Sequence, residues 1–186
     1  VLITVVYIAF ILLILIDGAL TISSWRTILS VSKPIKSNQS LSVSIIICAH
    51  NEIENLEKHL PFILNQDYPN FEVILGLDRC TDGSIEYVQS VANDHLVPVI
   101  IHETPSGWNS KKFVLRQCID KAQNDWLLLT DADCQPQSSK WIQSYVDHMS
   151  GATNLVLGVS PYQKEPHLIS LITEYETFIT ANKFLT

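Results

Sequence analysis

The sequence predicts an α/β fold in which a mostly parallel sheet, flanked by helices, follows an N-terminal transmembrane helix. Three observations predict it: an uncharged apolar run opens the chain, short apolar runs alternate with helical patterns from residue 42 onward, and the predicted strands are apolar almost throughout. Strands that alternate with helices are typical of βαβ units. Strands with few polar positions indicate a sheet that is covered on both faces.

The first predicted element is a membrane helix over residues 1–22. Residues 1–16 carry no charge. At the rise of an α-helix they cover roughly 24 Å, somewhat less than the ~30 Å hydrocarbon core of a bilayer. A cleaved signal peptide is one alternative, but its apolar core is usually shorter than this run. A buried core helix is the other.

A linker is predicted over residues 23–41, where Ser, Lys and Pro replace the apolar residues. Arg26, Lys33 and Lys36 follow the predicted span, and no acidic residue appears between residue 22 and Glu52. By the positive-inside rule this charge pattern places the rest of the chain in the cytoplasm, at the inner (cytoplasmic) membrane.

From residue 42 the predicted elements follow one another with short connections. Apolar runs predict five strands, over residues 43–48, 71–77, 97–101, 126–130 and 155–159. Apolar positions at helical spacing predict four helices, over residues 52–66, 84–94, 112–122 and 138–149. Ligands of open α/β sheets bind at the carboxyl edge of the strands, so polar residues just after these runs are the candidates for a site.

The fourth apolar run ends in two carboxylates, Asp131 and Asp133. Residues two apart on a strand share a face, so the two side chains could converge at the sheet edge. Magnesium is usually bound by one or two carboxylates together with substrate phosphates. Asp131 and Asp133 could therefore hold a hard divalent cation such as Mg²⁺ together with a diphosphate. An acidic turn is the alternative, because Asp is common in turns.

Polar residues also follow the first and second strands. After the first, Asn51 either caps the next helix, with Glu52 in its first turn, or contacts a nucleotide base. Asp78 ends the second strand and lies too early to cap a helix, so it can accept hydrogen bonds from a base or a ribose. Lys111 and Lys112 stand at a helix N-terminus, where cations are unfavourable unless they meet an anion. A solvated pair of lysines in a loop is the alternative.

Composition excludes several classes of protein. The net charge of −7 argues against a nucleic-acid-binding protein, which needs a basic face. No Gly-x-Gly-x-x-Gly follows the first strand, and no Walker lysine is present. The four cysteines, at positions 48, 80, 118 and 134, form no Cys-x-x-Cys pair and are expected to be reduced thiols of a cytosolic protein.

In this order the motifs resemble those of the family 2 glycosyltransferases of the GT-A fold, in the membrane-anchored bacterial branch. The resemblance covers residues 42 to about 160. It rests on the following stretches: Ala49-His50-Asn51-Glu52, Tyr68-Pro-Asn-Phe-Glu-Val73, Asp78 with Asp82-Gly83-Ser84, Lys111, and Asp131-Ala132-Asp133.

The resemblance implies an inverting transfer of a sugar from a nucleoside diphosphate to a glycan, a lipid or another acceptor, with Mg²⁺ or Mn²⁺ as cofactor. The nucleoside pocket would be lined by Ala49, His50, Asn51, Glu52 and Asp78. Lys111 would lie near the phosphates or the ribose, and Asp131, Ala132 and Asp133 near the metal–diphosphate, with Asp133 as the better candidate for direct ligand. Residues 42–186 would form the donor-binding half of a GT-A-like, Rossmann-type domain whose acceptor part is missing.

Three departures from the family's pattern stand out. The turn after the second strand contains Asp78-Arg79-Cys80 where many members have Asp-Asp-Gly, and Ser110 replaces the Gly that usually precedes the lysine. The later carboxylate that serves as catalytic base has no clear counterpart. Glu174 and Glu176 fall in a late helical pattern but do not match the family's motif, so no base is assigned.

Two other functions are weighed against the transferase. A non-catalytic, membrane-tethered module that binds nucleotide-sugars would also lack a base. A nucleotidyltransferase would be expected to have a Gly-rich, basic loop after the first strand, whereas residues 49–52 are neither Gly-rich nor basic.

Overall fold

The computed structural model describes residues 2–29, 41–149, 153–158, 160–162 and 166–185. The chain forms two compact units. One unit is Pro34–Val156, and the other combines Val1–Lys33 with Leu157–Thr186. Each unit is described by itself.

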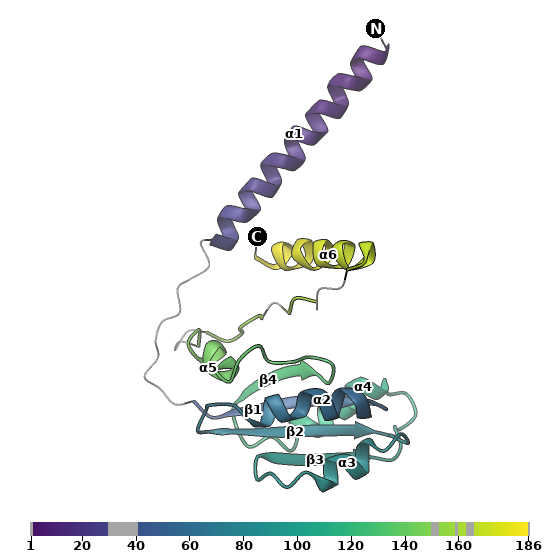
Figure 1. Ribbon diagram of the computed structural model, residues 1–186, viewed down its shortest axis with the longest axis vertical. Helices are drawn as coiled ribbons and strands as arrows, with labels where there is room; N and C mark the ends of the chain where they lie inside the picture. Colours follow the sequence, from purple (N-terminus) through teal and green to yellow (C-terminus); the bar gives the residue numbers. More distant parts are fainter. Residues whose placement is uncertain (1, 30–40, 150–152, 159, 163–165, 186) are drawn as a thin grey trace. The chain divides into compact units, whose positions relative to one another are not determined.

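The larger unit is built on a four-stranded sheet (Figure 1). Its strands are β1 (Val43–Ala49), β2 (Phe71–Asp78), β3 (Leu96–Ile101) and β4 (Trp126–Asp131). All the pairings are parallel, in the order β3-β2-β1-β4. The predicted parallel sheet is confirmed, and the bounds of these four strands lie within one residue of those predicted.

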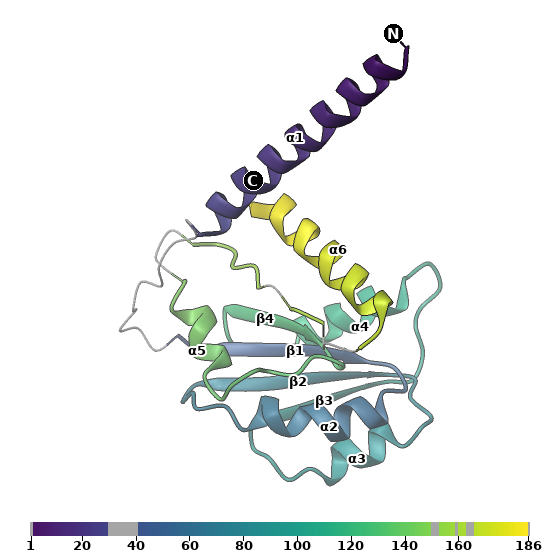
Figure 2. The ribbon, with the colours of Figure 1, turned by 45° about the horizontal axis from the view of Figure 1, so that its top comes forward.

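Helices cover both faces of this sheet (Figure 2). One face packs against α2 (Ile53–Leu64), α3 (Ser84–Ser90) and α5 (Trp141–Val146). The other face packs against α4 (Ser110–Ile119). Two layers of helix around a parallel sheet are what strands with few polar positions predict.

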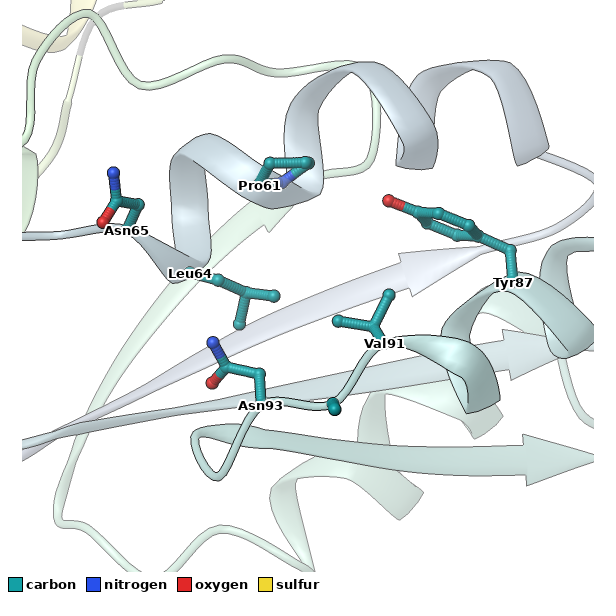
Figure 3. A pocket seen from close by; sticks show the side chains of 7 residues that line it. Pro61, Leu64, Asn65, Tyr87, Val91 and Asn93 are labelled. Atoms are coloured by element: carbon teal, nitrogen blue, oxygen red, sulfur yellow. The ribbon is translucent and has the colours of Figure 1, made fainter.

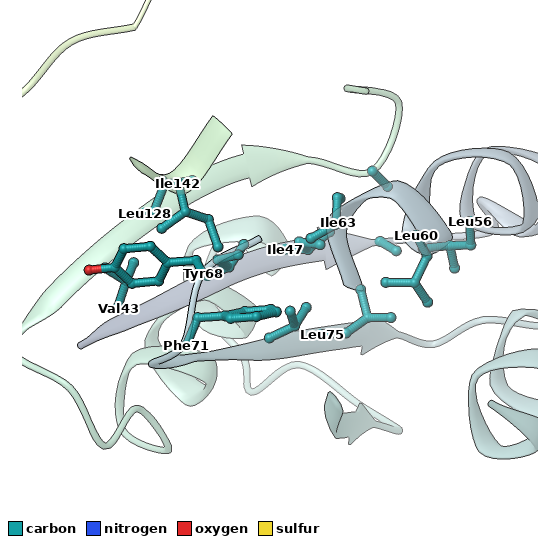
Figure 4. Close-up of a cluster of buried hydrophobic side chains, with 14 of the residues drawn as sticks. Val43, Ile47, Leu56, Leu60, Ile63, Tyr68, Phe71, Leu75, Leu128 and Ile142 are labelled. Carbon is teal, nitrogen blue, oxygen red and sulfur yellow. The ribbon is translucent and has the colours of Figure 1, made fainter. Parts of the chain in front are cut away.

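The side chains of β1 alternate between the two faces. Ile45 and Ile47 belong to the larger apolar cluster, together with Leu60 of α2 (Figure 4), and each is no more than 1% exposed. Ile46 points the other way and packs with Val114 of α4, which is fully buried. Because both sets are apolar, the strand is fixed from both sides.

Gly76 of β2 lets α4 lie close against the sheet. A Cβ built on this glycine would lie 2.4 Å from Val114 Cγ1 and 2.6 Å from Cys118 Sγ. Both atoms belong to side chains that are fully buried. The distance between α4 and β2 therefore depends on a residue without a side chain.

Two predictions about the end of this unit are wrong. The helix predicted over residues 138–149 is shorter, since α5 covers only Trp141–Val146. The fifth strand, predicted over residues 155–159, is not present in its described part, residues 155–158. Leu155 and Leu157 are 73% and 63% exposed there. An apolar run becomes a strand only where a neighbour accepts its backbone hydrogen bonds, and the composition of the run does not reveal that neighbour.

The smaller unit contains two helices, α1 (Leu2–Leu29) and α6 (Leu168–Leu185). Within α1, residues Ile3–Ser23 are long and apolar enough to cross a membrane, and none of the window is buried. Asp17 lies in this stretch, so one carboxylate would be close to the end of a membrane span. The helix continues past residue 22 into the predicted linker, and residues 30–40 of that linker lie outside the described residues.

We predict that Gly76→Ala lowers the free energy of unfolding by about 1–3 kcal/mol, because the new methyl group overpacks the contact between α4 and β2. Urea unfolding of the detergent-solubilised chain, followed by tryptophan fluorescence, measures this. The double variant Gly76→Ala, Val114→Ala restores room for the methyl group and should lose less stability than the sum of the two single variants. Strict additivity would show that the contact is not tight.

Candidate functional site

The carboxyl ends of β1, β2 and β4 meet at one edge of the sheet. Cys48 of β1 pairs with Gly76 on one side and with Asp131 on the other. Asp131 is therefore level with Cys48, and Asp78 lies two residues beyond this level, beside the loop that follows β1. The structure brings the predicted nucleoside, phosphate and metal residues to this single edge.

The loops after β1 and β2 are joined by hydrogen bonds. One interpretation of the sequence made Asn51 the N-cap of α2, and the structure shows that it is not. The N-cap residue is Glu52, and it makes no side-chain cap bond. Asn51 instead has a φ of 55°, and its Oδ1 accepts a hydrogen bond of 2.8 Å from the backbone N–H of Thr81. His50 adds a second tie, since its Nδ1 donates to the backbone carbonyl of Asp78.

Asp82 supplies the cap that Asn51 does not. Its Oδ2 accepts from the backbone N–H of Ile53, at 2.9 Å, in the first turn of α2. Its Oδ1 accepts from Ser84 Oγ at 2.6 Å and from Ser84 N at 3.1 Å, at the start of α3. Partial burial raises the pKa of the Asp82 carboxyl, but the hydrogen bonds from Ser84 and Ile53 outweigh it and leave that pKa lowered.

Asp78 is 7% exposed and is held by the residue that follows it. Arg79 donates from Nε to Asp78 Oδ1 at 2.8 Å and from Nη2 to Oδ2 at 2.9 Å. The hydrogen bonds from Arg79 lower the pKa of the Asp78 carboxyl, against the opposing effect of burial. Arg79 Nη2 also donates to Ser110 Oγ at 2.8 Å, so the pair is tied to the start of α4.

Asn51 and Arg79 are the two non-glycine residues with positive φ in the described part of the chain, at 55° and 48°. Arg79 directly follows the last residue of β2, and Asn51 is the second residue after the end of β1. Such backbone conformations are uncommon outside glycine and concentrate at functional sites. Their position here agrees with a site at this edge.

Lys111 of α4 meets Asp131 at the end of β4. The ammonium Nζ lies 2.8 Å from Asp131 Oδ1, and the two side chains are 70% and 60% exposed. The bond to Asp131 raises the pKa of Lys111. The Asp131 carboxylate is thus an anion within the chain itself that meets the lysine predicted at this helix start.

Asp133 lies two residues beyond Asp131, after the buried Ala132, and its side chain is exposed. Within the described ranges, no group of three or more His, Cys, Asp or Glu side chains is arranged to hold a metal ion. The end of β4 offers two carboxylates, Asp131 and Asp133, and Asp131 is already paired with the ammonium of Lys111. That donor set fits a hard divalent ion whose remaining ligands are phosphate and water oxygens.

Two hollows accompany these features, and only the smaller is at the edge. It measures about 140 Å³ and is lined by Ile46, Cys48, Lys111, Leu115, Leu129, Thr130 and Asp131. The larger, about 330 Å³, lies where α2 and α3 end and is lined mainly by Pro61, Leu64, Tyr87 and Val91 (Figure 3). It contains no carboxylate and lies at the opposite ends of these helices from the polar loops, so we place the candidate site at the smaller hollow.

The model of the glycosyl transferase family 2 matches residues 44–182. The chain belongs to this family. Family members similar to it include the glycosyltransferase AglE of Haloferax volcanii, 27% identical over 140 residues, which are 73% of this chain and 44% of AglE. Another is the cholesterol galactosyltransferase of Borreliella burgdorferi, 28% identical over 97 residues, which are 52% of this chain and 26% of that protein. The chain therefore spans less than half the length of these family members.

Among solved structures, the fold is similar to that of the mannosyltransferase PcManGT of Pyrobaculum calidifontis, determined in complex with GDP-Man and Mn²⁺. The TM-score is 0.59 at 23% identity, over 74% of this chain and 41% of that one. This similarity confirms the GT-A-like fold class. The resemblance to family 2 glycosyltransferases is confirmed as well.

Sequence reasoning missed Arg79 and Asp82 as organisers of the site. Arg79 and Ser110 were noted only as separate departures from the family's pattern, and the structure shows that these two residues contact each other. A joint departure at two positions is the signal that could have found the pair. Asp82 was noted only as part of the Asp82-Gly83-Ser84 motif, because its bond to Ile53 spans 29 residues of sequence and leaves no local pattern.

We predict that Asp82→Asn lowers the free energy of unfolding at pH 7 by about 1–2 kcal/mol, because an amide NH₂ would face N–H donors of α2 or α3. The pKa of Asp82 is lowered in the folded chain, so the stability it contributes is present above the unfolded value of about 3.9 and is lost as the pH falls through the lower folded value. The variant should therefore lose less stability than the parent on acidification below about pH 4.

Urea unfolding between pH 3 and pH 7 measures both effects. Asp94→Asn is the matched control, since Asp94 is exposed and makes no hydrogen bond or ion pair in the described part of the chain. An identical acid dependence in Asp82→Asn and the parent would contradict this role.

Proposed function

We propose that this chain carries the donor-binding part of a glycosyltransferase that transfers a sugar from a nucleoside diphosphate to a glycan, a lipid or another acceptor. The observation that supports it most is the convergence of Asp78, Lys111, Asp131 and Asp133 on one edge of a GT-A-like sheet. The names of similar proteins agree with it: PcManGT was determined with GDP-Man and Mn²⁺, and one relative is a cholesterol galactosyltransferase.

In this proposal the nucleoside lies over the joined loops after β1 and β2. Ala49, His50, Asn51 and Glu52 form one wall of the nucleoside pocket, and Asp78 forms the other. The Asp78 carboxylate meets the nucleoside with Arg79 already bound to it. The nucleobase or ribose must therefore form hydrogen bonds that are complementary to a paired carboxylate and guanidinium, which together offer acceptors and donors.

The diphosphate would lie between the start of α4 and the end of β4. Lys111 supplies an ammonium group there, and Asp131 and Asp133, on either side of Ala132, would hold Mg²⁺ or Mn²⁺. Such an ion supplies charge stabilisation on the leaving diphosphate when it is bound. Asp133 is the better candidate for a direct ligand, because Asp131 is already engaged by Lys111.

An inverting transfer needs a general base near the acceptor hydroxyl. Glu174 and Glu176 lie in α6, in the smaller unit, and we assign neither as the base. A module that binds nucleotide-sugars without catalysis is the alternative function. Donor binding without sugar transfer by the full-length protein would favour that module.

We further propose that residues 1–22 anchor the chain in the inner membrane and that residues 42–186, beyond the 23–41 segment, face the cytoplasm as the transferase domain. The proposal rests on the apolar stretch Ile3–Ser23 and on the basic residues that follow it.

We predict that the chain binds UDP or GDP only together with Mn²⁺ or Mg²⁺. Asp133→Asn should weaken this binding by about 10- to 100-fold, and Asp131→Asn by less. Calorimetry with each nucleotide, before and after EDTA treatment, measures it. Asp125→Asn, an exposed carboxylate just before β4, is the matched control and should leave the affinity unchanged. Equal nucleotide binding before and after EDTA treatment would contradict the proposed role of the metal in holding the diphosphate.

We predict that a reporter fused after Thr186 is active when it requires the cytoplasm and inactive when it requires the periplasm. The reason is the excess of basic residues after the apolar helix. Activity of the two reporters, measured in cells of equal expression level, decides the orientation. A fusion that works only in the periplasm would reverse it.

A further inference from the structure

The contact between Lys111 and Asp131 places a cation where the proposed function needs a metal. The Nζ–Oδ1 distance is 2.8 Å, and the charge of Asp133 also acts on the same ammonium. Lys111 therefore lies in the field of both carboxylates that would hold a divalent ion. An ammonium and a divalent ion compete for the same oxygen and repel each other at this range.

We infer that Lys111 occupies the cation site in the absence of donor and couples the binding of metal to the binding of diphosphate. The inference rests on the proposed function of this edge. A metal ion that binds alone must displace Lys111 from Asp131 and then remain close to a positive charge. A diphosphate provides the displaced ammonium with a new anionic partner, so the two ligands favour each other's binding.

The strength of the ion pair suits such an exchange. Both side chains are more than half exposed, and exposed ion pairs contribute little, about a factor of five in an equilibrium constant at most. Lys has a flexible four-carbon stem and a compact charge, so it can turn from a carboxylate to a nearby phosphate without moving α4. Coupling of this kind is reciprocal: the nucleotide must strengthen metal binding by the same factor as the metal strengthens nucleotide binding.

Lys112 is the natural comparison. It carries the same charge, one residue further along the same helix, and so points about 100° away around the helix axis. Lys112 is exposed, and in the described part of the chain its side chain forms no ion pair. A substitution there changes the net charge of the unit by the same amount and leaves the Lys111–Asp131 contact in place.

The test is Mn²⁺ binding by the whole detergent-solubilised chain, measured from the paramagnetic resonance signal of free Mn²⁺, with and without UDP or GDP. We expect Lys111→Gln to bind Mn²⁺ alone about 2- to 10-fold more tightly than the wild type. The factor by which nucleotide strengthens Mn²⁺ binding should fall by at least about threefold, because one part of the coupling is removed. Lys112→Gln should match the wild type within about twofold in both measurements.

Unchanged or weaker binding of Mn²⁺ alone by Lys111→Gln would overturn the inference. Equal effects of Lys111→Gln and Lys112→Gln would also overturn it, since they would show a general effect of charge. If the wild type binds neither UDP nor GDP at any Mn²⁺ concentration, the proposed function fails and the coupling fails with it. The measurement with Mn²⁺ alone then still decides whether Lys111 occupies the cation site.

Discussion

The parallel pairing of β1 with both of its neighbours is the constraint on which the rest of the site depends. Cys48 faces Gly76 of β2 and Asp131 of β4 at the same level, so the segments that leave these strands begin side by side. The loops can then bond to each other over distances of about 30 residues in sequence, as Asn51 and Thr81 do. A shift of one residue in either pairing would turn every side chain of the strand to the opposite face and separate these groups.

Opposite charges are paired across this edge. The buried carboxylate of Asp78 is bound by Arg79, and the exposed carboxylate of Asp131 is bound by Lys111. A row of unpaired carboxylates at one edge would repel one another and lower the stability of the sheet. The cations remove this cost and leave hydrogen-bonding capacity for an anionic ligand. Ser110 connects the two pairs, because it accepts from Arg79 and directly precedes Lys111.

Patterns within the chain predicted most of the sheet and several of the polar residues that lie at its carboxyl edge. The strands were predictable because each is a continuous apolar run, and Asp131 and Asp133 because they end such a run abruptly. The contacts that organise the edge were not predictable, since Arg79 with Ser110 and Asp82 with Ile53 join distant parts of the sequence. The strand predicted over residues 155–159 failed for a related reason: hydrophobicity alone does not show whether a neighbouring strand is available.

The edge strand β4 has a consequence for anyone who handles this protein in solution. Among the residues that the structure describes, it pairs with β1 on one side only, and Leu129 on this strand is 57% exposed. A strand that leaves one edge unpaired and carries an exposed leucine is a template onto which another chain can add. Concentrated preparations of the sheet unit are thus prone to edge-to-edge aggregation, and a lysine in place of Leu129 is the simplest change that would discourage it.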